Sequence, residues 1–148
     1  MNPIKIFTIG FTKKNAEDFF EKLRTNGVKK IIDIRLNNTS QLAGFTRKDD
    51  LRYFLKTILG IDYIHLPDLA PAKSMLDEYR KNKGNWPKYE HDFNRLMEER
   101  KPETKLQKDF LDGACLLCSE ASPTKCHRRL AAEYLKEKLG DVEIVHII

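Results

Sequence analysis

The chain has 148 residues, of which 41% are hydrophobic and 33% charged, and its formal net charge is +5. This length and balance predict one globular domain with a core of its own. No apolar run approaches the roughly 18 residues that span a bilayer, and no secretory signal pattern is present, so we expect a soluble, cytoplasmic protein with no membrane partner. The three cysteines, an odd number, give no disulfide framework and fit a reducing compartment.

The first half of the chain alternates short apolar strands with amphipathic helices. Hydrophobic periodicity predicts strands at residues 4–9, 30–35 and 61–65 and helices at residues 16–23 and 47–59. Asn26-Gly27 ends the first helix and Gly60 ends the second. A polar loop at residues 36–46 is unusually long for a simple connection.

The middle of the chain carries helices with no strand between them. Amphipathic spacing predicts helices at residues 72–82 and 88–100, separated by Lys83-Gly-Asn-Trp-Pro87, and a further helical turn at residues 106–111. The pattern then returns to a strand at 114–118, a helix at 126–139 and a last strand at 142–148.

This alternation predicts an α/β fold. We expect a three-layer sandwich whose mainly parallel sheet has about five strands, with helices on both faces and a helical insertion between the third and fourth strands. In such sheets, ligands bind beyond the carboxyl ends of the strands. Polar residues follow or close three of the predicted strands, and they should meet at one edge of the sheet: Thr8 and Gly10, Asp33 and Arg35, and Cys118 and Glu120.

The segment from Cys118-Ser-Glu120 to Cys126-His-Arg128 combines thiols, a carboxylate, an imidazole and guanidinium groups between a strand and a helix. Arginines and the helix N-terminus would lower the pKa of Cys118, which makes it a candidate nucleophile, and Glu120 is a second candidate for the chemistry. His127 is a candidate general acid or base near neutral pH. The alternatives are a buried, unreactive Cys118 and a His127 that is only hydrogen-bonded.

The start of the last helix is a candidate anion site. Ser122 or Thr124 would cap it, so that backbone N–H groups around Cys126 point towards the strand ends beside Arg128. Such amides with a guanidinium group bind phosphate or carboxylate. The alternative is a helix whose arginines pair with carboxylates of the protein.

Asp33 and Arg35 alternate with isoleucines, so both point to the same side of their strand. Polar residues at a strand end need partners. Either they form a structural network with Arg128 and Glu120, or they hold a substrate, and both can be true at once.

A zinc site is the main rival interpretation of the cysteines, because Cys-x2-Cys-x7-Cys-His supplies four possible zinc ligands. On a strand, however, Cys115 and Cys118 point to opposite faces, so one metal ion cannot easily take both. We therefore expect no metal site and no cofactor. Thr124 stands where a Cys-x5-Arg phosphatase loop starting at Cys118 would need arginine, which excludes that loop, and no Walker or Gly-x-Gly-x-x-Gly motif occurs.

The middle segment is basic and mixes cations with aromatic rings, as single-stranded nucleic-acid platforms do. Its members are Lys73, Arg80, Lys81, Lys83, Trp86, Lys88, Tyr89 and His91. We favour a second interpretation over this platform, a solvated helix pair in which Trp86 and Tyr89 close over the sheet. A third interpretation is a lid that brings Tyr89 and His91 to the strand ends. The pI near 9.1 supports nucleic-acid binding only through non-specific attraction.

Several short elements resemble one known family, the domain-of-unknown-function 488 (DUF488) family, in the expected order over nearly the whole chain. They are Thr8-Ile-Gly10, Ile32-Asp-Ile-Arg35 with Ser40 and Gly44-Phe45, Gly60-Ile-Asp-Tyr63, Leu117-Cys-Ser-Glu120 and Cys126-His-Arg128. After Gly10 the chain has Phe11-Thr12, where relatives often carry His or Tyr with a small residue. The resemblance implies a compact α/β fold and no established reaction.

Taken together, the residues predict a small enzyme that acts on a phosphate-containing or nucleotide-like substrate at an anion-binding site. The catalytic candidates are Cys118, Glu120 and His127, and the candidates for substrate binding are Thr8, Gly10, Asp33, Arg35, Cys126 and Arg128. Two alternatives remain open: a non-catalytic module that binds nucleic acid or a nucleotide, and a structural or partner-binding protein.

Overall fold

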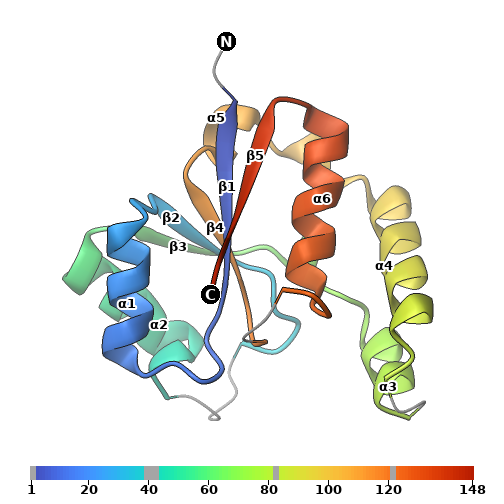
Figure 1. Ribbon diagram of the computed structural model, residues 1–148, viewed down its shortest axis with the longest axis horizontal. Coiled ribbons are helices and arrows are strands. Elements are labelled where there is room, and N and C mark those ends of the chain that lie inside the picture. Colours follow the sequence, from blue (N-terminus) through green and yellow to red (C-terminus); the bar gives the residue numbers. More distant parts are fainter. Residues whose placement is uncertain (1–2, 39–43, 82–83, 121–122) are drawn as a thin grey trace.

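The computed structural model describes residues 3–38, 44–81, 84–120 and 123–148 and contains one five-stranded sheet with helices around it (Figure 1). The paired strands are all parallel, and their order across the sheet is β3-β2-β4-β1-β5. The strands are β1 (Ile4–Gly10), β2 (Lys30–Asp33), β3 (Asp62–His65), β4 (Ala114–Cys118) and β5 (Val142–Ile147). The predicted α/β fold with a parallel sheet is therefore confirmed.

Helices cover both faces of this sheet. They are α1 (Ala16–Thr25), α2 (Lys48–Phe54), α3 (Lys73–Lys81), α4 (Trp86–Arg100), α5 (Lys108–Leu111) and α6 (His127–Leu139). Shorter helical segments are η1 (Gly44–Thr46), η2 (Leu55–Leu59), η3 (Pro67–Leu69) and η4 (Pro102–Lys105). None of the helices in the described parts of the chain is both long enough and apolar enough to cross a membrane.

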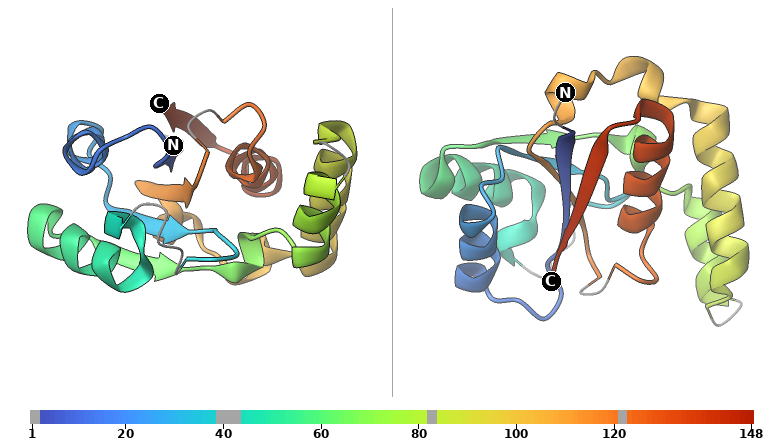
Figure 2. Two further views of the ribbon diagram at one scale, coloured as in Figure 1. Left: turned by 90° about the horizontal axis from the view of Figure 1, so that it is seen from below. Right: turned by 45° about the horizontal axis from the view of Figure 1, so that its top comes forward.

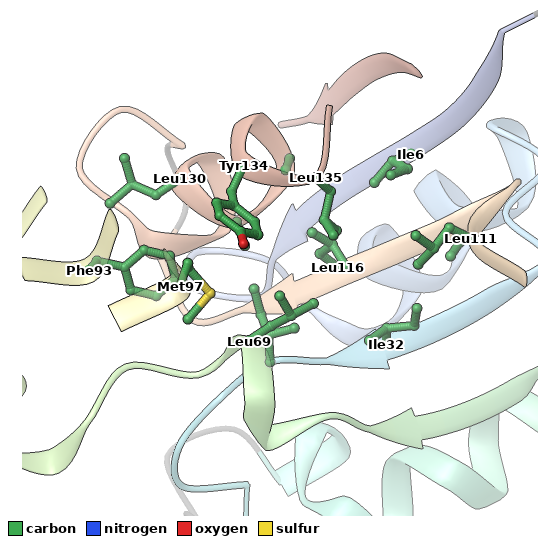
Figure 3. Close-up of a cluster of buried hydrophobic side chains, with 14 of the residues drawn as sticks. Ile6, Ile32, Leu69, Phe93, Met97, Leu111, Leu116, Leu130, Tyr134 and Leu135 are labelled. Atoms are coloured by element: carbon green, nitrogen blue, oxygen red, sulfur yellow. The ribbon is translucent and has the colours of Figure 1, made fainter. Parts of the chain in front are cut away.

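The two faces carry separate apolar cores. On one face, Phe19, Phe20 and Leu23 of α1 and Leu51 of α2 pack against the sheet. On the other, α6 lies against the sheet and α4 lies outside it (Figure 2). Figure 3 shows side chains of α4 and α6 in that second core, among them Phe93, Met97, Leu130 and Tyr134.

Within the helical insertion between β3 and β4, an arginine ties the end of α4 to the segment that follows β3. Arg100, the last residue of α4, donates hydrogen bonds from Nη1 to the carbonyl oxygens of Asp68 at 3.1 Å and Ala70 at 2.6 Å. These carbonyls belong to the connection between β3 and α3. The insertion packs beside α6, with the end of α3 and the start of α4 towards the carboxyl ends of the strands (Figure 1).

Several element boundaries differ from the sequence-based expectations for local reasons. Strand β2 ends at Asp33, two residues early, because the Asp33 carboxylate accepts a hydrogen bond of 3.0 Å from the backbone N–H of Arg35 and turns the chain. Helix α4 begins at Trp86 because the Asn85 side chain caps it by accepting from the backbone N–H of Lys88.

The start of α6 also differs from the prediction. Cys126, not Thr124, occupies the N-cap position, and its side chain makes no capping hydrogen bond. Ser122, the other predicted cap, lies outside the described residues, as do Ser40 and Lys83. The sulfur of Cys126 is therefore available for contacts other than capping.

Candidate active site

A cavity of about 610 Å³ lies beyond the carboxyl ends of β2 and β4. From these neighbouring strands the chain continues to opposite faces of the sheet, to α2 after β2 and to α6 after β4, which is where parallel α/β sheets bind ligands. The insertion supplies a further wall. The lining residues are Arg35, Leu36, Asn37, Pro71, Lys73, Leu76, Asp77, Tyr79, Arg80, Trp86, Tyr89, Cys118, Ser119, Glu120, Lys125, Cys126 and His127.

Two thiols and an imidazole meet in the cavity wall. Cys118, the last residue of β4, and Cys126, the N-cap of α6, have their Sγ atoms 3.0 Å apart, with the Cys126 thiol donating. The Nδ1 atom of His127, the first residue of α6, lies 3.3 Å from the Cys118 Sγ atom. A parallel strand and the helix that follows it thus bring residues eight and nine positions apart into one cluster.

The Cys118 thiol is only 5% exposed, and its surroundings favour the thiolate. Burial alone acts to raise the pKa of Cys118. Hydrogen bonds from the Cys126 thiol and from the backbone N–H groups of Ser119 and Glu120, together with the positive charge of Arg128, outweigh burial and lower that pKa below its ordinary value. Cys118 therefore has the ionisation expected of a nucleophile.

The pKa of Cys126 is shifted in the opposite direction, above its ordinary value. Its hydrogen bond to Cys118 is the largest effect and, with burial, raises the pKa of Cys126, while His127 acts to lower it. The two thiols therefore behave as a coupled pair that loses its first proton readily and retains the second between the two sulfur atoms. Burial, followed by the negative charge shared by the Cys118–Cys126 pair, also raises the pKa of Tyr89, which keeps that phenol neutral.

The same three side chains could hold a metal ion, since ligand atoms of Cys118, Cys126 and His127 all lie within 4.8 Å of one another. Two thiolates and an imidazole suit zinc. Cys115 takes no part, because it belongs to the core on the opposite face of the sheet, where burial raises its pKa. A four-ligand site made from both cysteines of the Cys-x2-Cys pair is accordingly not formed.

Asp33 and Arg35 form a buried ion pair behind another part of the cavity wall. The Arg35 guanidinium donates to both carboxylate oxygens, from Nε at 2.9 Å and from Nη2 at 2.8 Å. The Tyr63 hydroxyl donates to the same carboxylate at 2.5 Å, and Arg35 also donates to the carbonyl oxygen of Thr46 at 2.7 Å. Only Arg35 of the pair reaches the cavity, so Asp33 orients Arg35 from behind.

Arg128 is fully buried and is not among the residues that line the cavity. Its Nη1 group donates to the carbonyl oxygen of Glu120, so it ties α6 to the segment after β4. Gly10 permits this contact, because a Cβ atom at Gly10 would overlap both the Glu120 carbonyl oxygen and the Arg128 guanidinium. Arg128 therefore acts on the cavity through its charge on Cys118.

The remaining sequence candidates are placed at different depths. Glu120 is exposed and lines the cavity. Thr8 is completely buried, and its hydroxyl forms a hydrogen bond of 2.6 Å with Nδ1 of His146 on β5. Neither Thr8 nor Gly10 contributes to the cavity lining. Both residues support the sheet beneath the cluster.

The comparison with protein families finds one match at the level of a family model. The model described as "Domain of unknown function DUF488" matches residues 15–135, which is most of the chain. The chain belongs to the DUF488 family. The comparisons with curated proteins and with solved structures found no match.

The matched region of this DUF488 chain contains every cavity-lining residue, whereas Thr8 and Gly10 precede it. Sequence reasoning missed the cavity roles of Tyr79 and Lys125, and it missed Tyr63 as the donor to Asp33. The sequence did offer a signal for a polar role of Tyr63. Its short strand, Asp62–His65, carries polar residues at both ends. The roles of Tyr79 and Lys125 depend on how the insertion and the loop before α6 fold back, which no local pattern encodes.

Proposed function

We propose that this DUF488 protein is a thiol-dependent enzyme that acts on a small phosphate-containing or nucleotide-like substrate, with Cys118 as the nucleophile. The observation that carries the proposal is the position of Cys118. Its sulfur lies in the wall of a 610 Å³ cavity, with His127 Nδ1 3.3 Å away and surroundings that lower the pKa of Cys118. This is the arrangement of an activated nucleophile beside a base.

The charge of the cavity wall supports an anionic substrate. Arg35 is neutralised by Asp33, and Lys73 lies 3.8 Å from the Asp77 carboxylate. Among the other lining residues, two cations, Arg80 and Lys125, face one carboxylate, that of Glu120. The wall therefore retains positive charge, which favours phosphate or carboxylate groups.

The aromatic residues of the insertion support a substrate with a flat ring. The rings of Trp86 and Tyr89 are stacked with centroids 5.1 Å apart, and the row continues through Phe93 to His127. Trp86, Tyr89 and Tyr79 line the cavity. The partly exposed rings of Trp86 and Tyr79 give a nucleobase or similar ring a surface to stack on, while its anionic group lies near Arg80 or Lys125.

In the proposed reaction, His127 Nδ1 accepts the Cys118 proton and the thiolate attacks an electrophilic atom of the substrate. The bond to the leaving group breaks, and the leaving group takes the proton from His127. We assign to Glu120, which lines the cavity, the acceptance of a proton from the water that releases the enzyme-bound group. Arg128 stabilises the thiolate from behind the wall.

A nucleic-acid-binding module is less well supported by the insertion. Lys88 lies between the carboxylates of Glu78 and Asp92, at 3.1 and 2.8 Å, so its charge is compensated. Tyr89 is buried and cannot stack on the bases of a polymer. The aromatic and basic residues enclose a cavity, which suits a mononucleotide better than an extended strand.

The proposal is tested by alkylation of Cys118 with two reagents that differ in charge, iodoacetate and iodoacetamide. An anion-accepting cavity should raise the rate for the anionic reagent relative to the neutral one, and salt should reduce the difference. Adenosine 5′-monophosphate should slow both reactions and should change the fluorescence of Trp86, the single tryptophan of the chain. Adenosine or inorganic phosphate alone should do so more weakly.

Matched variants identify which part of the cavity wall raises the rate for the anionic reagent. Arg80→Ala and Lys125→Ala should lower the iodoacetate-to-iodoacetamide rate ratio severalfold, whereas Lys56→Ala, an exposed lysine on η2, should leave it unchanged. An equal ratio in all four proteins, with no response to the nucleotide at low salt, would refute an anion-binding enzyme site.

A further inference from the structure

Cys118 and Cys126 are free cysteines whose sulfur atoms are in direct contact. Their Sγ atoms are 3.0 Å apart, about 1 Å more than the roughly 2.05 Å of a disulfide bond. Each cysteine stands at the end of an element, Cys118 at the end of β4 and Cys126 at the N-cap of α6. Small rotations there can bring the sulfur atoms together without breaking the sheet or the helix.

We propose that Cys118 is a site of reversible oxidation, at which a hydroperoxide converts the Cys118–Cys126 pair into a disulfide. Cys126 is the resolving residue in this reaction. The proposal rests on the proposed function only for the assignment of Cys118 as the reactive thiol. It assigns to Cys126 a task that attack on a substrate does not require.

The reaction balances in two steps. The Cys118 thiolate attacks one oxygen of hydrogen peroxide, the O–O bond breaks, Cys118 becomes a sulfenic acid, and the hydroxide released takes a proton from His127 to form water. Cys126 then attacks the Cys118 sulfur, the S–O bond breaks, and the hydroxide takes the Cys126 proton to form a second water. The pair loses two electrons and the peroxide gains them.

The raised pKa of Cys126 is consistent with a reaction in which Cys118 is oxidised first and Cys126 attacks second. The largest cause of its raised pKa is the hydrogen bond to Cys118, followed by burial. Oxidation of Cys118 to a neutral sulfenic acid removes the negative charge that holds the Cys126 proton. The neighbouring His127 already acts to lower the pKa of Cys126, so the second thiol becomes easier to ionise after the first has reacted.

The geometry also explains how hydrogen peroxide reaches the two sulfur atoms and why Cys126, not Cys115, is the disulfide partner. Both sulfur atoms belong to residues that line the cavity, so a reagent as small as hydrogen peroxide can reach them although the side chains are nearly buried. Cys115 cannot compete as a partner, because it lies in the core on the opposite face of the sheet. The disulfide would remove the nucleophile and protect Cys118 from irreversible oxidation to the sulfinic acid.

The test is to treat the full chain with hydrogen peroxide and to measure intact mass and map its peptides. Wild-type protein should lose two hydrogens, link Cys118 to Cys126, and recover all its thiols with dithiothreitol. Cys126→Ser should instead gain oxygen at Cys118, first as a sulfenic acid that dimedone traps, then as a sulfinic acid that dithiothreitol does not reverse. Cys115→Ala is the matched control and should behave as wild type.

Three results would overturn the proposal: a Cys126→Ser protein that recovers its thiols as fully as wild type, a disulfide that includes Cys115, or wild-type Cys118 that passes to the sulfinic acid with Cys126 still reduced. Circular dichroism of each variant establishes that it is folded before oxidation. These readouts need no substrate. If the disulfide forms in a protein that fails the alkylation and nucleotide tests, the result would therefore support this inference and refute the proposed enzyme function.

Discussion

The Nδ1 atom of His127 faces the Sγ atom of Cys118 at 3.3 Å because the other side of the imidazole is held by the backbone just after β2. Nε2 of His127 lies 2.8 Å from the carbonyl oxygen of Ile34, and a carbonyl can only accept, so Nε2 carries a hydrogen. In the neutral ring, Nδ1 then has the lone pair. The contact between the Ile34 carbonyl, just after β2, and α6 thereby selects the tautomer that can take the thiol proton.

The first prediction concerns the pH dependence of Cys118 alkylation. Because the pKa of Cys118 is lowered, the thiolate fraction at neutral pH should exceed that of an ordinary cysteine, and the iodoacetamide rate should reach half its maximum below about pH 8.5. Cys126→Ala removes a hydrogen bond to the thiolate, so its profile should move to higher pH. At a pH below both pKa values, each unit of that move lowers the rate by about tenfold.

Cys115→Ala again serves as the control for this prediction, because Cys115 lies in the opposite core and should leave the profile unchanged. Peptide mapping after brief labelling assigns the reaction to Cys118. A wild-type profile centred at or above that of free cysteine would contradict an activated thiol.

More of the fold than of the candidate site could be predicted from the sequence. Apolar runs bounded by glycine or polar turns identify the strands, and the long spacing between them requires parallel crossovers, which the pairing of β1 with β4 and β5 confirms. The end of β2 could not be placed, because it depends on the Asp33 carboxylate bonding to the N–H of Arg35. The alternation of apolar residues along a strand does not register a side chain that turns the backbone.

For the site, the sequence indicates which strand ends converge but not how deep each side chain lies. Cys118 and Arg35 line one cavity as their places at or just after strand ends suggest, whereas Arg128, predicted to hold an anion, is buried behind the wall. Its direct contact with a substrate stays a prediction. Depth depends on the approach of Gly10 to the Glu120 backbone, a contact between distant segments.

The second prediction concerns the buried ion pair of Asp33 and Arg35. Arg35→Met leaves the Asp33 carboxylate buried without its cationic partner, and we expect it to lower the free energy of unfolding by about 3–5 kcal/mol. Adding Asp33→Asn should recover part of that loss, because the remaining side chain is neutral. Urea denaturation of the two single variants and the double variant measures the coupling.

The exposed pair of Lys56 and Asp62 provides a matched comparison, since its side chains are 69% and 75% exposed. Lys56→Met should change stability by only roughly 0–1 kcal/mol. Equal losses for Arg35→Met and Lys56→Met would show that the buried pair does not stabilise the fold in the way its geometry implies.

The third prediction concerns Gly10, at the end of β1. Gly10→Ala would place a methyl group against the Glu120 carbonyl oxygen and the Arg128 guanidinium, so backbone must move. We expect a loss of at least about 1–3 kcal/mol in thermal or urea unfolding, together with slower alkylation of Cys118 as Arg128 is displaced. Gly44→Ala is the control, because no atom lies within 4 Å of the added group. Similar stabilities for the two variants would contradict the close approach.

The last prediction separates a nucleophilic thiol from a metal centre at the same atoms. The enzyme proposal requires Cys118 to be uncoordinated in the working protein, so material purified without added metal should contain well under one zinc per chain. Added Zn²⁺ should slow iodoacetamide labelling of Cys118, since thiolates of Cys118 and Cys126 and the imidazole of His127 lie within reach of one ion, and EDTA should restore the rate. Cys126→Ser should need more Zn²⁺ for the same effect, whereas Cys115→Ala should not. Stoichiometric zinc that survives EDTA, with Cys118 unreactive until the metal is removed, would replace the nucleophile by a metal site, because zinc would then hold the thiolate that the proposed attack on a substrate requires.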